Sequence, residues 1–281
     1  MYAERIGERE LKEFERHLRQ EERSTGTVEK YLRDAGRFAA WLGKRVVSKE
    51  NTALWKEELC ALGYQAGTVN TMLSAVNRFL SFLGREECRV RYLRIQRRIF
   101  RGVERELTRQ DYGRLLETAQ ELGRRRLALL LETICATGIR VSEVKYITVE
   151  AAGAGRAEVA LKGKIRTILL PAKLCRKLLK YAKGQKTASG EIFLTRGGKG
   201  ISRRQIWAEM KALCARAGVA PSKVFPHNLR HLFARTFYKA SRDIARLADV
   251  LGHSCIETTR IYLISTGVEH ARQMERLGLL L

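Results

Sequence analysis

The sequence is poor in several features that mark other classes of protein. Only three prolines occur in 281 residues, and no low-complexity tract is present. The six cysteines are scattered without a Cys-x-x-Cys pair, which argues against a structural zinc site and favours free thiols in a reducing compartment. No apolar run approaches the roughly 20 residues of a membrane-spanning helix, and the charged N-terminus is not followed by the apolar stretch of a signal peptide. We therefore expect a cytoplasmic protein without a membrane segment.

Acidic residues are also scarce relative to basic ones. The chain has 54 lysines and arginines against 30 aspartates and glutamates, a formal net charge of +24. An excess of this size indicates a polyanionic partner, most simply nucleic acid. Hydrophobic residues make up 45% of the chain, enough to build the core of one large domain or two ordinary ones.

The first 86 residues show apolar side chains at helical spacing. Helices are predicted around 11–18, over 28–42 with an end at Gly43, after Asn51 as far as Gly63, and from Thr68 to Gly84. Four helices with short connections predict a small helical bundle.

An arginine-rich stretch, RVRYLRIQRRIFRG at 89–102, interrupts this pattern. We predict that residues 87–106 form a basic interdomain linker that can lie on phosphate groups. An exposed strand or helix with solvated arginines is the other interpretation.

Residues 107–281 mix helical and strand signals. Thr108 and Asp111 resemble a capping box. A β-hairpin is predicted over 157–171 around the polar turn at 162–164, with a third short strand at 191–195. Helices are predicted at 109–122, 124–136, from about 143, and at 172–183, 202–217, 227–240, 242–251, 255–264 and near the C-terminus. The expected fold class is mainly α with a small β-sheet: a helical bundle followed by a mixed α+β domain.

Six residues of the second region, taken together, suit chemistry on a phosphodiester. Arginines bind phosphoryl oxygens in a bidentate way, a lysine can act as a general acid, and a phenol can act as a nucleophile. His227 and Arg230 are spaced to share one helix face, and Pro226 places His227 in a first turn that favours anions. The six residues are Arg140, Lys162, His227, Arg230, His253 and Tyr262.

Each of these residues has a plain structural interpretation as well. His227 could be a helix cap, Arg140 a surface cation and Tyr262 a core residue. His253 could interact with a helix C-terminus ending at Leu251–Gly252. Lys164, in the same predicted turn, competes with Lys162 for the role of general acid.

The motifs ATGIRVSE, HNLRH and LGH, with the order Arg…Lys…His-x-x-Arg…His…Tyr, resemble those of the tyrosine recombinase (phage integrase) family, and in particular its Xer-like members. The resemblance covers nearly the whole chain. It implies that 1–86 form a SAM-like core-binding domain and that 107–281 form the catalytic domain with a C-terminal helix. The loop around Lys162 is short against the family pattern GKGxKxR, which leaves Lys162 and Lys164 both open.

The resemblance also implies a role for each residue. Arg140 and Arg230 would bind the scissile phosphate, and Tyr262 would attack it to form a 3′-phosphotyrosyl link. The general acid would be Lys162, while His227 would assist proton transfer and His253 would hydrogen-bond the phosphate. The bond energy is kept in the phosphotyrosine, so neither ATP nor a metal or other cofactor is implied.

The partner implied by the resemblance is double-stranded DNA with inverted-repeat core sites, on which four copies would assemble over two sites. The hydrophobic end Leu277–Leu281 would belong to a C-terminal helix that docks on a neighbouring subunit or packs in cis. The implied setting is a bacterial cytoplasm with the nucleoid. Integration, excision and dimer resolution stay open, as do the target sequence and any partner recombinase.

DNA contacts are predicted in three places: the fourth helix of the first domain, the linker, and the helix that begins near residue 202. Exposed polar helix faces are the competing interpretation. The residues concerned are Asn70, Asn77, Arg78, Arg94, Arg97, Arg98, Arg101, Arg203 and Arg204. Two other functions share the residue pattern: a type IB-like DNA topoisomerase and a DNA-binding relative that has lost catalysis.

Overall fold

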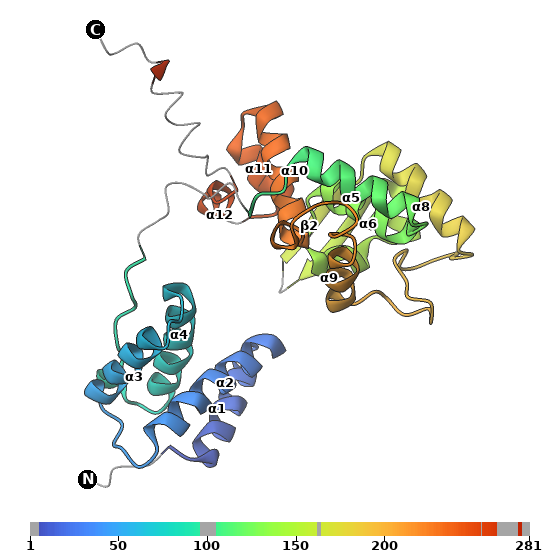
Figure 1. The fold of residues 1–281 in the computed structure, drawn as a ribbon. Coiled ribbons are helices and arrows are strands. Elements are labelled where there is room, and N and C mark those ends of the chain that lie inside the picture. Colours follow the sequence, from blue (N-terminus) through green and yellow to red (C-terminus); the bar gives the residue numbers. More distant parts are fainter. Residues whose placement is uncertain (1–5, 96–104, 162–163, 254, 263–274, 277–281) are drawn as a thin grey trace. The chain divides into compact units, whose positions relative to one another are not determined.

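The computed structural model describes residues 6–95, 105–161, 164–253, 255–262 and 275–276. The chain divides into two compact units, residues 1–97 and 98–281 (Figure 1). No helix among the residues described is both long enough and apolar enough to cross a bilayer.

The first unit contains the four helices that the periodicity predicts. They are α1 (Glu8–Gln20), α2 (Thr25–Leu42), α3 (Lys49–Ala61) and α4 (Ala66–Phe82), followed by a short 3-10 turn at Glu86–Cys88. Helix α4 packs against α2 and α3, and its apolar side chains between Val69 and Leu80 are buried. Phe14 of α1 and Phe79 of α4 meet with ring centroids 4.9 Å apart, while Phe38 of α2 meets Trp55 of α3 at 5.2 Å. Burial of these aromatic faces contributes to the stability of the unit.

Two asparagines of α4 hold the segment that follows the bundle. The amide of Asn77 donates to the carbonyl of Val90 at 2.9 Å and accepts from its N–H at 3.1 Å. Asn70 makes the same pair with Leu93, at 2.9 and 2.7 Å. Seven helical residues rise about 10.5 Å and three extended residues span about 10 Å, so the two spacings match. The segment therefore runs antiparallel to α4 as part of the first unit.

The second unit is mainly helical around one two-stranded antiparallel sheet. Strands β1 (Arg156–Leu161) and β2 (Lys164–Leu169) pair with Val159 opposite Arg166. The helices are α5 (Arg109–Glu121), α6 (Arg125–Thr137), α7 (Val149–Ala154), α8 (Ala172–Gly184), α9 (Arg203–Lys211), α10 (Pro226–Ser241), α11 (Ile244–Leu251) and α12 (Ile256–Arg260), with 3-10 segments at Val141–Tyr146 and Pro221–Lys223. The predicted capping box is confirmed, because Thr108 and Asp111 exchange side-chain to backbone hydrogen bonds.

The core of this unit is built on α6, whose residues are apolar on most sides. Leu127, Leu130, Leu131 and Ile134 are buried, and α6 packs against α5, α8, α9 and α10. Helix α6 ends at Thr137, and its C-cap Gly138 adopts a left-handed conformation with φ 65°. This turn delivers the chain to Arg140 at the edge of the core.

The prediction of a third strand at 191–195 is wrong. Only isolated bridges form there, between Thr148 and Glu191 and between Leu194 and Gly200. The chain folds back through Gly198, and the N–H of Thr195 donates to Lys199 at 2.7 Å. Local turn bonds thus use the backbone groups that a sheet would need. The apolar Ile192 and Phe193, which suggested a strand, are buried instead.

Three helix predictions also differ from the structure. The helix predicted over 202–217 ends at Lys211 and continues as turns to Gly218, although Leu213 and Ala217 remain buried and explain the periodicity. Helix α12 covers only Ile256–Arg260. Helix α7 was not predicted as a separate element; Thr148 caps it by accepting from the Ala151 N–H at 3.1 Å. The predicted C-terminal helix and the tail Leu277–Leu281 lie outside the described residues, except for 275–276.

Candidate active site

Arg230 is the largest fully buried side chain of the second unit, with 1% of its surface exposed. It lies in the second turn of α10, which begins with Pro226 at its first position. Its Nη1 donates to the Gly138 carbonyl and its Nη2 to the Leu251 carbonyl at 2.8 Å. Its Nε donates to the phenol oxygen of Tyr262 at 3.3 Å. The guanidinium thus joins four segments of the chain.

The carbonyls that hold Arg230 belong to helix C-termini. Gly138 is the C-cap of α6, and Leu251 is the last residue of α11. Such carbonyls lack intrahelical partners and carry the negative end of the helix dipole. They compensate a charge that burial makes costly; burial, and to a lesser degree the nearby Arg140, lower the pKa of Arg230 from its usual value.

Tyr262 follows α12 and is 5% exposed. It packs with Ala234, Leu247 and Leu251. Imidazole rings surround its own ring: the centroid of His231 lies 4.3 Å away, that of His253 5.6 Å and that of His227 5.8 Å. The phenol oxygen therefore lies beside a guanidinium, within a ring of three histidines.

His253 connects Arg230 to α12. Its Nε2 lies 2.9 Å from Nη2 of Arg230, and its Nδ1 lies 2.8 Å from Oγ1 of Thr259. A guanidinium can only donate, so Nε2 accepts and the neutral ring carries its proton on Nδ1. Burial, followed by the charges of Arg230, Arg140 and Arg166, lowers the pKa of His253 to about 4. His253 is therefore a neutral imidazole at physiological pH.

His227 occupies the first turn of α10 and is exposed. Its ring lies 5.1 Å from that of His231 in an edge-to-face arrangement. The two histidines are four positions apart, which places them on one face of the helix. His227 is at the solvent side of the cluster, where a substrate can reach it.

Arg140 follows the Gly138 turn and begins the 3-10 segment Val141–Tyr146. Its side chain is 40% exposed, and its Nη1 donates to Oε1 of Glu143 at 3.0 Å. The Arg140 N–H donates to the other carboxylate oxygen at 2.7 Å. Glu143 is itself only 1% exposed, so it fixes both the backbone and the side chain of Arg140.

The two lysines proposed as the general acid flank the β1–β2 turn. Lys162 lies outside the described residues, and for Lys164 the structure describes only its backbone at the start of β2. The choice between them therefore stays open.

Arg166 also belongs to this cluster, although the sequence motifs did not indicate it. It comes from β2; its Nη2 forms an ion pair with Oε2 of Glu143 at 3.2 Å, and its Nη1 donates to the Leu251 carbonyl. The alternation of the hairpin could have indicated it, because Arg166 faces the same side as the buried Ile168. A charged residue at an inward position signals a partner.

The residues predicted to contact DNA are in different situations. Asn77 is buried and both ends of its amide are used by Val90, and Asn70 is similarly engaged with Leu93. Arg78 is paired with Glu21. The side chains that project into solvent are those of Arg94, Arg203 and Arg204, whereas Arg97, Arg98 and Arg101 lie outside the described residues.

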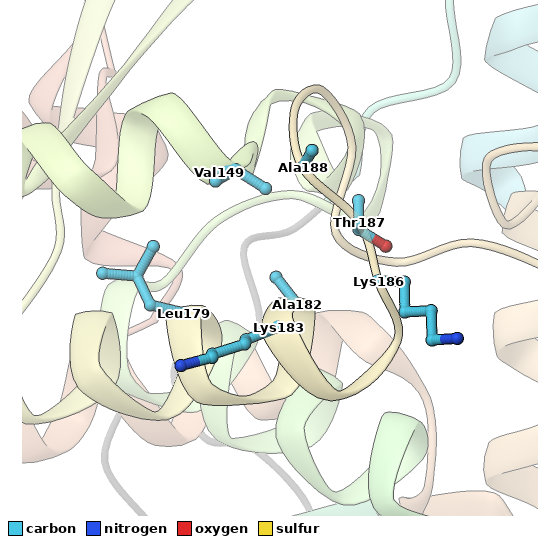
Figure 2. A pocket seen from close by; sticks show the side chains of 7 residues that line it. All are labelled: Val149, Leu179, Ala182, Lys183, Lys186, Thr187 and Ala188. Carbon is cyan, nitrogen blue, oxygen red and sulfur yellow. The ribbon is translucent and has the colours of Figure 1, made fainter.

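A shallow groove lies elsewhere on this unit, between α7, α8 and the turn that follows α8 (Figure 2). Its walls include Val149, Leu179 and Ala182, and the side chains of Lys183 and Lys186 extend in opposite directions. None of the predicted catalytic residues lines this groove. Within the described part of the chain, no cluster of histidine, cysteine and acidic side chains has the arrangement of a metal site.

The arrangement around Arg230 has the chemistry of a site for a phosphodiester. It offers fixed cations for non-bridging oxygens, a neutral imidazole and a phenol as nucleophile. Among the described residues, the fold brings together Arg140, His227, Arg230, His253 and Tyr262 from four segments spread over more than 120 positions of the sequence.

Comparisons with known proteins agree over both units. Residues 105–267 match the family model described as the Phage integrase family, and residues 11–87 match that described as Phage integrase, N-terminal SAM-like domain. The chain is 30% identical over 277 residues to tyrosine recombinase XerC of Roseiflexus castenholzii, covering 90% of this chain and 88% of that protein. It is 28% identical over 281 residues to tyrosine recombinase XerA of Pyrococcus furiosus, covering 96% and 94%.

Two solved structures show a similar fold. The XerH site-specific recombinase bound to its difH substrate gives a TM-score of 0.70 at 19% identity, covering 95% of this chain and 84% of that one. A lambda integrase (75–356) dimer bound to a COC′ core site gives 0.71 at 16% identity, covering 91% and 94%.

Proposed function

The chain belongs to the phage integrase family of tyrosine recombinases and is a site-specific recombinase that breaks and rejoins DNA, and from this premise we propose that the cluster around Tyr262 carries out the reaction. The contact between Nε of Arg230 and the phenol oxygen of Tyr262, at 3.3 Å, is the observation that carries the proposal. A donor at this oxygen stabilises the negative charge that develops there as the phenol loses its proton. The same guanidinium is available to an adjacent phosphate.

In the first step, the Tyr262 oxygen forms a bond to phosphorus and the bond from phosphorus to the 5′ oxygen breaks. Arg140 and Arg230 bind the non-bridging oxygens, whose charge grows in the pentavalent transition state. Once DNA displaces its present contact with Arg230, the neutral His253 takes the other tautomer: its Nδ1 accepts from the Thr259 hydroxyl and its Nε2–H donates to the phosphate. Arg230 exchanges one of its internal contacts in the same way.

Two proton transfers complete this step. The exposed His227, 5.8 Å from the Tyr262 ring, takes up the phenol proton, and a lysine of the β1–β2 turn, Lys162 or Lys164, protonates the leaving 5′ oxygen. A 5′ hydroxyl of a partner strand then attacks the phosphotyrosyl group and releases Tyr262. One phosphoester is exchanged for another in each step, so the reaction needs no external energy source.

We assign residues 1–86 to DNA binding and 107–281 to catalysis; of the predicted linker 87–106, the part as far as Leu93 packs on α4 with the first unit. The two compact units and the family matches at 11–87 and 105–267 support this division. The DNA partner is supported by the structures of similar fold that were solved on DNA. Inverted-repeat core sites, four copies on two sites and action in the cytoplasm complete the proposal.

The exposed cations Arg94, Arg203 and Arg204 are the proposed DNA contacts among the described residues. Asn70, Asn77 and Arg78 are left out because internal partners occupy their side chains.

A covalent-capture experiment tests the nucleophile and the target together. The full chain is incubated with sheared DNA of its host and denatured, and the protein-linked DNA is sequenced. Enrichment of one site by the wild-type chain and by Tyr238→Phe, but not by Tyr262→Phe, supports the proposal. Adducts that persist in Tyr262→Phe would reject it, and adducts without sequence preference would indicate relaxation of DNA instead of recombination.

A further inference from the structure

We propose that Arg166 is a positioning residue of the recombination site: it fixes the arginines that grip the phosphate and matches the charge of the site to the transition state. The inference rests on the proposed role of Tyr262 and its neighbours. Its basis is the contacts of the Arg166 side chain, which link Glu143 beside Arg140 to the Leu251 carbonyl beside Arg230.

The first argument is geometric. Glu143 has two cationic partners, Arg140 through Oε1 at 3.0 Å and Arg166 through Oε2 at 3.2 Å. The Leu251 carbonyl likewise accepts from both Arg166 and Arg230. Arg166 is therefore the bridge between the two arginines proposed to hold the phosphate. It also ties them to the hairpin whose turn carries Lys162 and Lys164, since it lies in β2 only two residues after Lys164.

The conformation of Gly252 makes room for this bridge. Gly252 caps α11 in a left-handed conformation with φ 63°, and a Cβ atom at this position would overlap the Arg166 side chain. Two features of this chain therefore require glycine in the LGH motif. One is the left-handed turn itself, and the other is the space that the Arg166 side chain needs to reach the Leu251 carbonyl.

The second argument is electrostatic. Three guanidinium groups, of Arg140, Arg166 and Arg230, surround the single carboxylate of Glu143, which leaves a surplus of two positive charges. A phosphodiester carries one negative charge, and its pentavalent transition state carries two. The surplus on these fixed side chains therefore equals the charge of the transition state, and without Arg166 it would equal that of the ground state. The lysine of the turn is counted apart, because it gives its proton to the leaving 5′ oxygen. Binding the transition state more strongly than the ground state is what accelerates a reaction.

The burial and hydrogen bonding of the Arg166 side chain agree with a site that binds an anion. The side chain is 15% exposed; its buried Nε has no hydrogen-bond partner among the described residues, and its buried Nη2 has only the ion pair with Glu143. Burial lowers its pKa to about 10, despite the opposing effect of Glu143. Buried donors without acceptors cost free energy, and an anion bound nearby recovers part of that cost.

The test measures the rate of covalent complex formation on a nicked duplex that carries a site recovered by the Tyr262-dependent capture. Arg166→Gln is expected to slow this step by on the order of 10², with DNA affinity changed only a few-fold. Arg166→Lys keeps the positive charge but lacks the paired N–H donors of a guanidinium, so its rate should lie between those of Arg166→Gln and the wild type. The matched control is Arg156→Gln, an exposed arginine of the same hairpin, which should behave as the wild type.

A second substrate separates charge matching from folding. A methylphosphonate at the scissile position lowers the charge of the transition state from two to one. On this substrate the deficit of Arg166→Gln should nearly vanish, because two positive charges are no longer needed. A deficit of the same size on both substrates, without rescue by lysine, would reduce Arg166 to a folding role. A wild-type rate for Arg166→Gln would overturn the inference outright, and adduct formation by Tyr262→Phe would reject the proposed function instead.

Discussion

The Nε of Arg230 donates to the phenol oxygen of Tyr262 over 3.3 Å, so the proposed phosphate ligand and the proposed nucleophile are in direct contact. Arg230 is held by carbonyls at the ends of two helices, and Tyr262 lies on the core of α10 and α11. The site is therefore part of the hydrophobic core, and changes in it should affect stability as well as catalysis.

Arg230→Ala is expected to abolish covalent complex formation and also to lower the free energy of unfolding by roughly 2–5 kcal/mol, because buried acceptors lose their donors. Arg230→Lys should keep the positive charge but slow cleavage by about 10²–10³-fold, since an ammonium group lacks the paired N–H donors of a guanidinium. Urea unfolding and single-turnover cleavage measure the two effects. Arg176→Lys, on the exposed face of α8, is the control and should change neither. Wild-type cleavage by Arg230→Lys would contradict the proposed role.

The imidazole of His253 is expected to stay neutral as the pH falls, until about pH 4, because burial and then the surrounding arginines lower its pKa. In the unfolded chain it takes up a proton near pH 6.5. The unfolded state therefore binds more protons between these values, and stability should fall as the pH decreases from about 6.5 to about 4 and then level off. Histidine NMR titration measures the pKa directly, and His253→Asn should lack this component of the pH dependence of unfolding. Titration of His253 near pH 6.5 would refute the prediction.

Asn77→Ala should release the extended segment that follows the bundle. The buried Val90 N–H and C=O would lose their partners, at a cost of about 1–3 kcal/mol for each group that stays unsatisfied. Hydrogen exchange should show loss of protection at the Val90 amide in the full chain. Thr71→Ala, at an exposed position of the same helix, should leave that amide protected. Unchanged exchange at Val90 in Asn77→Ala would show that the amide pair does not hold the segment.

Two left-handed glycines offer a matched comparison. Gly155→Ala meets open space and should cost only the backbone strain, about 1–2 kcal/mol. Gly138→Ala would in addition overlap the Phe233 ring and displace the carbonyl that accepts from Arg230. It should lower the free energy of unfolding by clearly more than Gly155→Ala does and also slow cleavage. Equal effects of the two substitutions in thermal unfolding would argue against tight packing at Gly138.

The salt dependence of DNA binding should show which exposed arginines neutralise DNA phosphates. If Arg94 neutralises one phosphate, Arg94→Ala should reduce the slope of log affinity against log salt by about 0.9. Arg9, which is exposed on α1 and near Glu10 and Glu13, provides the control, and Arg9→Ala should keep the wild-type slope. An unchanged slope for Arg94→Ala would remove this residue from the proposed DNA surface.

Much of the fold could be predicted because periodicity and capping act locally. The four helices of the first unit and the β-hairpin follow from apolar spacing and turn residues, and the box of Thr108 and Asp111 marks the start of α5. The segment 191–195 misled the same reasoning, since an apolar run is buried equally well in a strand or in a folded-back loop. Periodicity reports burial and does not identify the backbone partner.

The sequence alone determined the charge surplus, the residue types of the site and their order, because these are properties of composition and motif. Only the tertiary structure decided which groups meet. Arg166 lies in the cluster because β2 places it beside Glu143. The side chain of Asn77 is buried, although its position in the sequence suggested an exposed helix face. Contacts between residues as far apart as Arg166 and Leu251 depend on how helices and strands pack, and no local pattern encodes that. The helix ends that pack around Arg230 thus assemble the proposed phosphate site. The sequence shows the types and order of its residues but not their contacts.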